Sequence, residues 1–246
     1  MPEFCCSLLL TIDINNSHKM KRLISSISFL LFINSCLVAQ INESITVKAG
    51  TRITDYFPLE ERYLYDDFMM GKAIFTNDRI YSTLFNYNFL TGEMEFIKTN
   101  DTLAIADKKD LISVIVEKDT FYYSSGYLQK IRSGKLKVYS KQYVKIKDIL
   151  KKGAMGTVNR SAASESYDYL LYGPLSYDLV TDYDMVLQKT EVFYFSTEKE
   201  DFVLFNRTNI IAILPFTKDY IKSNKIKFKS REDILKLADY INEVLS

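Results

Sequence analysis

The chain has 246 residues, of which 47% are hydrophobic and 14% aromatic, and its formal net charge is +1. So large an apolar fraction excludes disorder of the whole chain. The three cysteines and the single histidine all lie before residue 40, and the chain has no tryptophan.

Residues 20–39 have the order of a secretory signal peptide. The basic tripeptide Met20–Arg22 precedes an apolar stretch, Leu23–Val38, and Ala39 follows as the small residue before a cleavage point. The stretch has about 16 residues, whereas a membrane-spanning helix needs roughly 20. We therefore expect cleavage before Gln40 and export to the periplasm or to the outside of the cell.

Two further features of this region bear on where the protein is anchored. Residues 1–19 fit no part of a signal peptide because acidic residues precede the basic ones, so we expect Met20 to be the initiator. The segment Ile33–Cys36 loosely resembles a bacterial lipobox, in which Cys36 would carry a lipid and become the new N-terminus. We favour soluble export, and a lipoprotein anchored through Cys36 is the alternative.

Loss of residues 1–39 would remove most residue types used in catalysis. All cysteines and the only histidine leave with the leader, together with three basic and two acidic residues, so the net charge falls to zero. Disulfides, cysteine nucleophiles, Ser-His-Asp triads and zinc sites of nitrogen and sulfur ligands are thereby excluded. A neutral chain gives no general argument for binding nucleic acid. We expect no cofactor and no metal.

Residues 40–151 are predicted to form an antiparallel β region. Short runs of alternating β-branched and aromatic residues follow one another about every ten residues, with Asn, Asp and Gly between them. The expected strands are 72–75, 79–90, 93–97, 102–106, 111–117, 120–123 and 127–131. Such a series is typical of a meander that curls into a barrel or a sandwich.

Residues 152–166 and 167–246 differ from this pattern. The first segment is small and polar without an apolar period, which predicts a flexible loop or linker. The second, which we expect to pack on the same domain, begins with a predicted hairpin of strands 185–195 and 201–205 and continues into helices.

The C-terminal helices carry clear sequence signals. A short helix over 209–214 stops at Pro215, and Thr217 can cap a second one. The last helix has Ser230 at its N-cap and Asp233 three positions later. Its apolar residues recur at three- and four-residue spacing, at Ile234, Leu237, Ala238, Ile241 and Leu245. The predicted fold class is therefore β-rich α+β, an antiparallel meander with a C-terminal helical segment.

The most distinctive candidate for binding is the lysine strip, which occupies the odd positions of residues 135–147. In a strand these side chains share one face. They are Lys135, Lys137, Tyr139, Lys141, Tyr143, Lys145 and Lys147. A cationic strip with aromatic residues can bind a polyanion such as a phosphorylated glycan or a lipid head group. A solvated strand whose lysines discourage edge-to-edge pairing is the interpretation that we favour, so the seven residues remain candidates only.

Carboxylate pairs are the candidates for catalysis. Glu60–Glu61 and Asp66–Asp67 would point apart if they lay in strands, whereas Asp182 and Asp184 could share a face. A hydrolase using carboxylate, Tyr or Lys chemistry would need a pocket that gathers two or more of Asp182, Asp184, Glu191 and a buried lysine.

Tyrosine is abundant, with 18 residues in the chain. It clusters at Tyr63/Tyr65, Tyr122/Tyr123 and Tyr167/Tyr169/Tyr172. Alternating aromatic residues at strand spacing more often fill a core or a cross-strand ladder than a ligand groove. We therefore expect these clusters to be structural.

One segment carries a resemblance to other proteins. Leu84–Asn88, Gly92–Ile97 and Asp101–Leu103 together resemble uncharacterised secreted proteins of the Bacteroidetes, and the leader ending at Gln40 is similar to leaders from that group. The similarity runs from about Tyr63 to the C-terminal helix. It implies a lineage and a periplasmic or surface location, and it implies no activity and no site residues.

The function that these observations favour is a non-enzymatic, exported envelope protein that acts as a binding or structural accessory. Its partner would be another envelope protein or an anionic ligand, and we expect neither nucleic acid as a partner nor a transmembrane segment after cleavage. An interaction scaffold should show an exposed apolar patch or an open sheet edge. The alternative remains the hydrolase described above.

Overall fold

The structure is a computed structural model. It describes residues 44–76, 78–99, 101–152, 158–162, 180, 182–197 and 201–246. The predicted leader, Cys36 and the cluster Tyr167/Tyr169/Tyr172 lie outside these residues. The described residues belong to one compact unit, and none of their helices is both long and apolar enough to cross a membrane.

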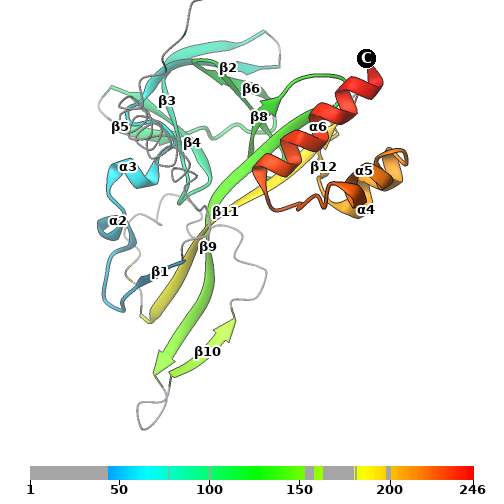
Figure 1. Cartoon of the computed structure of the whole chain (residues 1–246). Coiled ribbons are helices and arrows are strands. Elements are labelled where there is room, and N and C mark those ends of the chain that lie inside the picture. The colour runs from blue at the N-terminus through cyan, green and yellow to red at the C-terminus, as the bar shows by residue number, and fades with distance from the viewer. Residues whose placement is uncertain are drawn as a thin grey trace, which may run out of the picture. The chain divides into compact units, whose positions relative to one another are not determined.

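Twelve strands of the described chain form a single antiparallel sheet (Figure 1). In spatial order ten of them are β1 (Ser44–Val47), β11 (Asp184–Ser196), β9 (Lys137–Lys152), β8 (Tyr127–Arg132), β7 (Asp119–Tyr123), β6 (Leu111–Val116), β2 (Met69–Phe75), β3 (Ile80–Asn88), β4 (Glu93–Lys98) and β5 (Asp101–Ala104). The short strands β10 (Val158–Ala162) and β12 (Val203–Leu204) pair with β9 and β11. The predicted antiparallel meander is confirmed, and it forms one open sheet that ends at β1 and β5.

The turn between β3 and β4 shows how the local sequence directs a hairpin. The side-chain Oδ1 of Asn88 accepts the backbone N–H of Leu90 at 2.9 Å, which bends the chain directly after β3. Gly92 then adopts a positive φ of 65°, and its N–H bonds the Asn88 carbonyl at 2.9 Å. An Asn followed by a Gly four residues later therefore places β4 beside β3.

The segment predicted as a loop contains a strand. Residues 158–162 form β10, which pairs with β9 in antiparallel register from Val158↔Lys152 to Ala162↔Asp148. A five-residue strand without an apolar period gives no sequence signal, because its pairing comes from backbone hydrogen bonds to β9. Residues 153–157 and 163–166 of the predicted loop lie outside the described residues.

Five helices are described. They are α2 (Ile53–Tyr56), α3 (Leu59–Arg62), α4 (Arg207–Ile213), α5 (Thr217–Ser223) and α6 (Arg231–Leu245). The predicted cap of α6 is confirmed, since the Ser230 side chain accepts the Asp233 N–H at 3.3 Å. Thr217 does not cap α5: it is the first residue of the helix, it is buried, and its hydroxyl donates to the Leu214 carbonyl.

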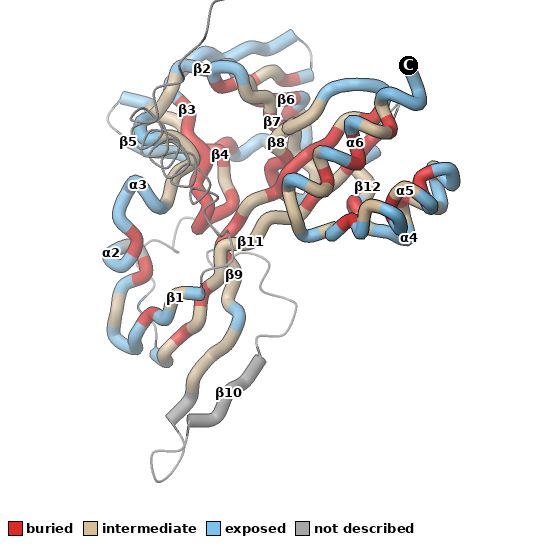
Figure 2. Tube along the Cα trace, in the orientation of Figure 1, coloured by how far each residue is buried: buried red, intermediate tan, exposed pale blue. Residues whose placement is uncertain are grey.

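Helix α6 lies along β9 (Figure 1) and is fastened to it by one amide side chain. The Leu136 N–H donates to Asn242 Oδ1 at 2.8 Å, and Asn242 Nδ2 donates to the Leu136 carbonyl at 3.0 Å. The apolar stripe predicted for this helix is buried at Ile234, Leu237, Ala238 and Ile241, whereas Leu245 at its end is exposed. Figure 2 shows buried positions of α6 in red.

The buried apolar residues form two clusters that meet the same face of the β9–β11 pair. The first cluster includes Phe85, Tyr87, Met94, Val114, Phe121 and Tyr127 of β3 to β8, together with Val144 and Leu187. The second cluster includes Val138, Phe193 and Phe195, together with residues of α4, α5 and α6. In the register of the pair, Val138 faces Phe195 and Val144 faces Lys189, so the two clusters occupy successive lengths of one sheet face.

Candidate functional site

The lysine strip does not form a continuous exposed face. Tyr139, Lys141 and Tyr143, at its centre, are buried, with 0%, 6% and 8% of their surface exposed. The ring of Phe202 packs at 4.8 Å from that of Tyr139, and the Lys141 ammonium donates to the Ser125 carbonyl at 2.8 Å. Lys135 is exposed just before β9, Lys137 and Lys145 are partly exposed, and Lys147 is exposed. Neighbouring segments cover this face as well as the other, which alternation within one strand cannot reveal.

The predicted carboxylate candidates do not come together. Asp184, at the start of β11, pairs with Lys48 at 2.8 Å and accepts the Ala49 N–H at 2.9 Å, so it fastens the turn after β1. Asp182 is exposed and precedes β11, and Glu191 lies seven residues after Asp184 along the strand. Glu60 and Glu61 lie in α3, and Asp66 and Asp67 in the bend before β2.

Glu191 belongs to a polar belt between the two apolar clusters. Its side chain is 5% exposed, and Oε1 accepts hydrogen bonds from the Ser140 hydroxyl and from Arg231 Nη1 at 2.6 Å. Lys189, two residues away on the same strand face, has its ammonium 3.6 Å from the centroid of the Phe89 ring. Burial lowers the pKa of Lys189, while the charges of Glu191 and Glu61 act in the opposite direction.

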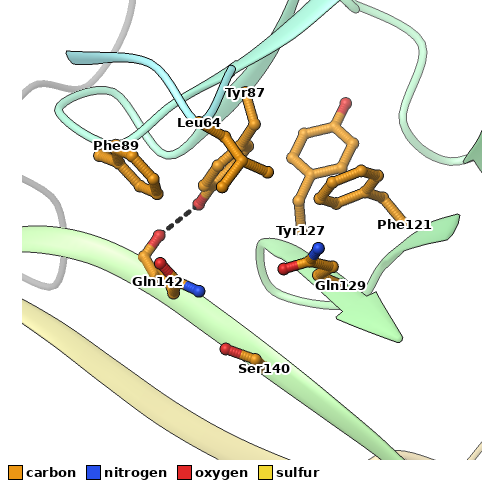
Figure 3. A pocket seen from close by; sticks show the side chains of 8 residues that line it. All are labelled: Leu64, Tyr87, Phe89, Phe121, Tyr127, Gln129, Ser140 and Gln142. Carbon is orange, nitrogen blue, oxygen red and sulfur yellow. Dashed lines mark hydrogen bonds between the residues drawn. The ribbon is translucent and has the colours of Figure 1, made fainter. Parts of the chain in front are cut away.

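The cavity beside this belt is too small for a substrate. Figure 3 shows its walls, including Tyr87, whose hydroxyl points to the Gln142 carbonyl at 2.7 Å. Tyr127 and Phe121 close the opposite side. Its volume is about 10 Å³, about the space that one water molecule needs. Neither Lys189 nor Glu191 lines this cavity, so it gives the pair no space in which to meet a substrate.

A second buried polar cluster lies in the segment whose sequence resembles that of secreted Bacteroidetes proteins. Glu95 is 2% exposed, and it accepts hydrogen bonds from the Tyr63 hydroxyl at 2.6 Å and from Asn88 Nδ2 at 3.1 Å. Asn86 fixes the segment that precedes β2, because its side chain accepts a hydrogen bond from the Tyr65 N–H and donates one to the Tyr65 carbonyl. Each polar group here has partners within the fold, so the cluster fixes the approach to β2 and offers nothing to a ligand.

A mostly apolar groove in the described part of the chain lies between β3 and β4, and we call it the β3–β4 groove. It has a volume of about 710 Å³, within the range of about 300–1,000 Å³ found for small-molecule sites. Its apolar walls include Phe75, Tyr81, Phe85, Phe96, Leu103 and Ile105. Phe85 and Ile105 belong to the first cluster and are 1% and 6% exposed, so they form the floor of the groove at the edge of that core.

The groove exists because two neighbouring strands separate. β3 and β4 pair from Phe85↔Phe96 to Asn88↔Glu93. Beyond Phe85, residues 80–84 pair with β2 alone, and residues 97–98 of β4 pair with β5 alone. The Thr83 hydroxyl reaches across to the Ile97 carbonyl at 2.9 Å, at the point where the strands diverge.

Exposed apolar side chains and charges surround the mouth of the groove. Tyr81 is 57% exposed and Leu103 is 41% exposed, although both project from the face that elsewhere covers the core. Arg79 sits over the Phe75 ring at 5.4 Å and pairs with Asp107 at 3.5 Å. Lys98 also lines the groove. The mouth thus combines an apolar interior with a charged rim.

Sequence reasoning missed this groove. The residues that form it were predicted as ordinary strand residues at 72–75, 79–90, 93–97 and 102–106. Their alternation is the same whether the neighbouring strand continues alongside or turns away. The one feature of the sequence that points to the groove is Tyr81, a large aromatic residue close to the turn after β2.

Comparison of the chain with known protein families, with curated proteins and with solved structures gives no match. The resemblance to secreted Bacteroidetes proteins stays a prediction. The function must therefore be argued from the geometry of the described residues.

Proposed function

We propose that this protein is an exported, non-enzymatic binding protein of the cell envelope, and that the β3–β4 groove holds a small molecule with a long apolar chain. The observation that supports this best is the opening of an aromatic core into a groove of about 710 Å³. Core side chains are normally covered, and an uncovered concave apolar surface of this size marks a binding site. Export and location rest on the signal-peptide pattern of residues 20–39.

The chemistry of the groove selects the ligand class. The accessible apolar side chains of Tyr81, Phe96 and Leu103 offer dispersion contacts and few hydrogen bonds. The polar side chains lie at the rim, where Lys98 and the Arg79–Asp107 pair can meet a polar head group. An acyl chain with an acidic head fits this distribution.

Binding of cis-parinaric acid, a fluorescent fatty acid, tests the proposal. We expect saturable binding with one site per chain. The double variant Tyr81→Ser, Leu103→Gln should lower the affinity about tenfold, the change that a loss of about 1.4 kcal/mol of apolar contact produces.

The matched control changes two exposed apolar residues of β2 and β3 on the opposite face of the sheet. Met70 and Leu84 are 61% and 38% exposed and lie opposite each other in the β2–β3 register. Met70→Gln, Leu84→Gln should leave the affinity unchanged. Absence of saturable binding, or equal losses in both double variants, would rule out the groove as the binding site.

A further inference from the structure

A second groove lies at the edge of β11, on the side away from β9, and we call it the β11 groove. Its volume is about 430 Å³, and β11 contributes Gln188, Thr190, Glu191, Val192 and Phe193 to its walls. It is separate from the β3–β4 groove, and the two share none of their lining residues. An inference drawn from it is independent of the proposed function.

The groove occupies a gap in strand pairing. β1 pairs with β11 up to Ser44↔Gln188. β12 pairs with it from Tyr194↔Leu204, and the Phe205 N–H bonds the Phe193 carbonyl at 2.8 Å. Between these contacts, residues 189–192 have no strand partner on this edge among the described residues. A sheet edge that lacks a partner over about four residues accepts a short extended peptide as an added strand.

The charges around the gap are mostly positive. Lys145, Lys229 and Arg231 line the groove, and Glu191 is the one acidic residue among the lining side chains. Glu191 is already engaged by Arg231 at 2.6 Å. Lys145 and Lys229 have no ion-pair partner within the described residues. Over the described residues, the groove therefore carries a net positive charge next to a strand edge that has no partner strand.

The interior of the groove is aromatic. Phe205 and Phe228 lie with ring centroids 6.2 Å apart and both line the groove, together with Phe193. A strand added to β11 alternates its side chains between two faces. Phe193 and Phe205 are 2% exposed and Phe228 is partly exposed, so one set of the peptide side chains can contact Phe228 while acidic side chains reach the lysines.

From the gap, the charges and the aromatic interior together, we propose that the β11 groove binds an extended acidic peptide segment of a partner protein by strand addition to residues 189–192. The main chain of the peptide supplies hydrogen bonds to β11, and its carboxylates meet Lys145 and Lys229. Lys145 and Tyr143 are the residues of the lysine strip that line this groove. The strip thus contributes two of its residues to the proposed site, together with Lys229 and Arg231.

Selection from a phage-displayed library of random seven-residue peptides tests the inference. We expect the enriched peptides to carry at least two acidic residues separated by one position. For a synthetic copy of the leading peptide, Lys145→Glu, Lys229→Glu should weaken binding by about tenfold or more. The control Lys218→Glu, Lys222→Glu, which reverses the same charge on α5, should have little effect.

Strand addition also predicts that binding depends on hydrogen bonds of the peptide main chain. Methylation of alternate peptide nitrogens should abolish binding to the unaltered protein, and the bound peptide should slow hydrogen exchange of the Glu191 amide. Circular dichroism and thermal unfolding confirm that each variant is folded.

Three outcomes would overturn the inference. The library could enrich no acidic peptide, the lysine reversals could have no larger effect than their control, or inorganic phosphate at millimolar concentration could displace a peptide that tolerates methylation. The last result would identify a site for small anions. None of them depends on whether the β3–β4 groove binds a fatty acid.

Discussion

The two apolar clusters differ in how they are shielded from solvent. The second cluster is sealed by α6, whose Ile234, Leu237, Ala238 and Ile241 are completely buried. The first cluster is enclosed by strands and opens at the β3–β4 groove, where Tyr81 and Leu103 remain exposed. A helix can cover the end of a core with one apolar stripe, whereas two strands that diverge leave an opening. The open cluster is therefore where we expect ligand binding, and the sealed one is where we expect stability.

The largest effect expected from this difference is on stability. Leu237→Ala removes a completely buried side chain and leaves a cavity, which should lower the free energy of unfolding by about 2–5 kcal/mol. Leu103→Ala removes a partly exposed one, and the change should stay within about 0.5 kcal/mol. Urea unfolding of both variants measures the contrast. Equal losses would show that the groove is closed in solution.

The next prediction compares two asparagines whose side chains accept hydrogen bonds from backbone N–H groups. Asn88 is completely buried, bonds Glu95 and holds the turn after β3, so Asn88→Ala should cost about 1–3 kcal/mol. Asn206 caps α4 by accepting the Asn209 N–H at 2.8 Å, and Asn206→Ala should cost about 1 kcal/mol. Thermal unfolding of both variants shows which of them loses more stability. A smaller loss at Asn88 than at Asn206 would contradict a structural role for the buried polar cluster.

Alkaline pH should lower the stability of the protein through two tyrosines of the first cluster. Burial, and then the charge of Glu93, raises the pKa of Tyr87 and of Tyr127 well above the ordinary tyrosine value. Stability from such groups is present below the unfolded-state pKa of about 10 and is lost as pH rises above it, because only the unfolded chain then releases the protons. The free energy of unfolding should fall by up to about 1.4 kcal/mol per pH unit for each tyrosine.

Urea unfolding between pH 9 and 11.5 measures this slope. Tyr87→Phe and Tyr127→Phe should each reduce it. Phe89→Leu, beside Tyr87 with ring centroids 5.6 Å apart, should lower stability without changing the slope. Equal slopes in all four proteins would show that these tyrosines are accessible to solvent.

Much of the local structure could be read from the sequence. Expected strands 93–97 and 120–123 correspond to β4 and β7 within one residue at each end, because Asn, Asp and Gly mark the turns between short alternating runs. Helix α6 and its Ser230 cap follow from an apolar stripe and a single polar residue. The antiparallel β-rich class with a helical C-terminal segment follows from these elements together.

The candidate sites could not be read in the same way. Alternation assigns Lys141 and Lys145 to one strand face, but it does not tell which of them a neighbouring segment will cover. Asp182 and Asp184 share a short stretch of sequence with no pocket between them. The grooves depend on where pairing stops, at Phe85↔Phe96 and at Ser44↔Gln188, and pairing is a property of two strands.

The sequence by itself determined which segments extend, where they turn and which helix face is apolar, because these depend on residues a few positions apart. The tertiary structure decided that all the strands join one open sheet and that two apolar clusters share one face of β9–β11. It also decided that the first cluster opens between β3 and β4. The physical reason is that exposure depends on what packs against a side chain, and those partners lie far away in the chain.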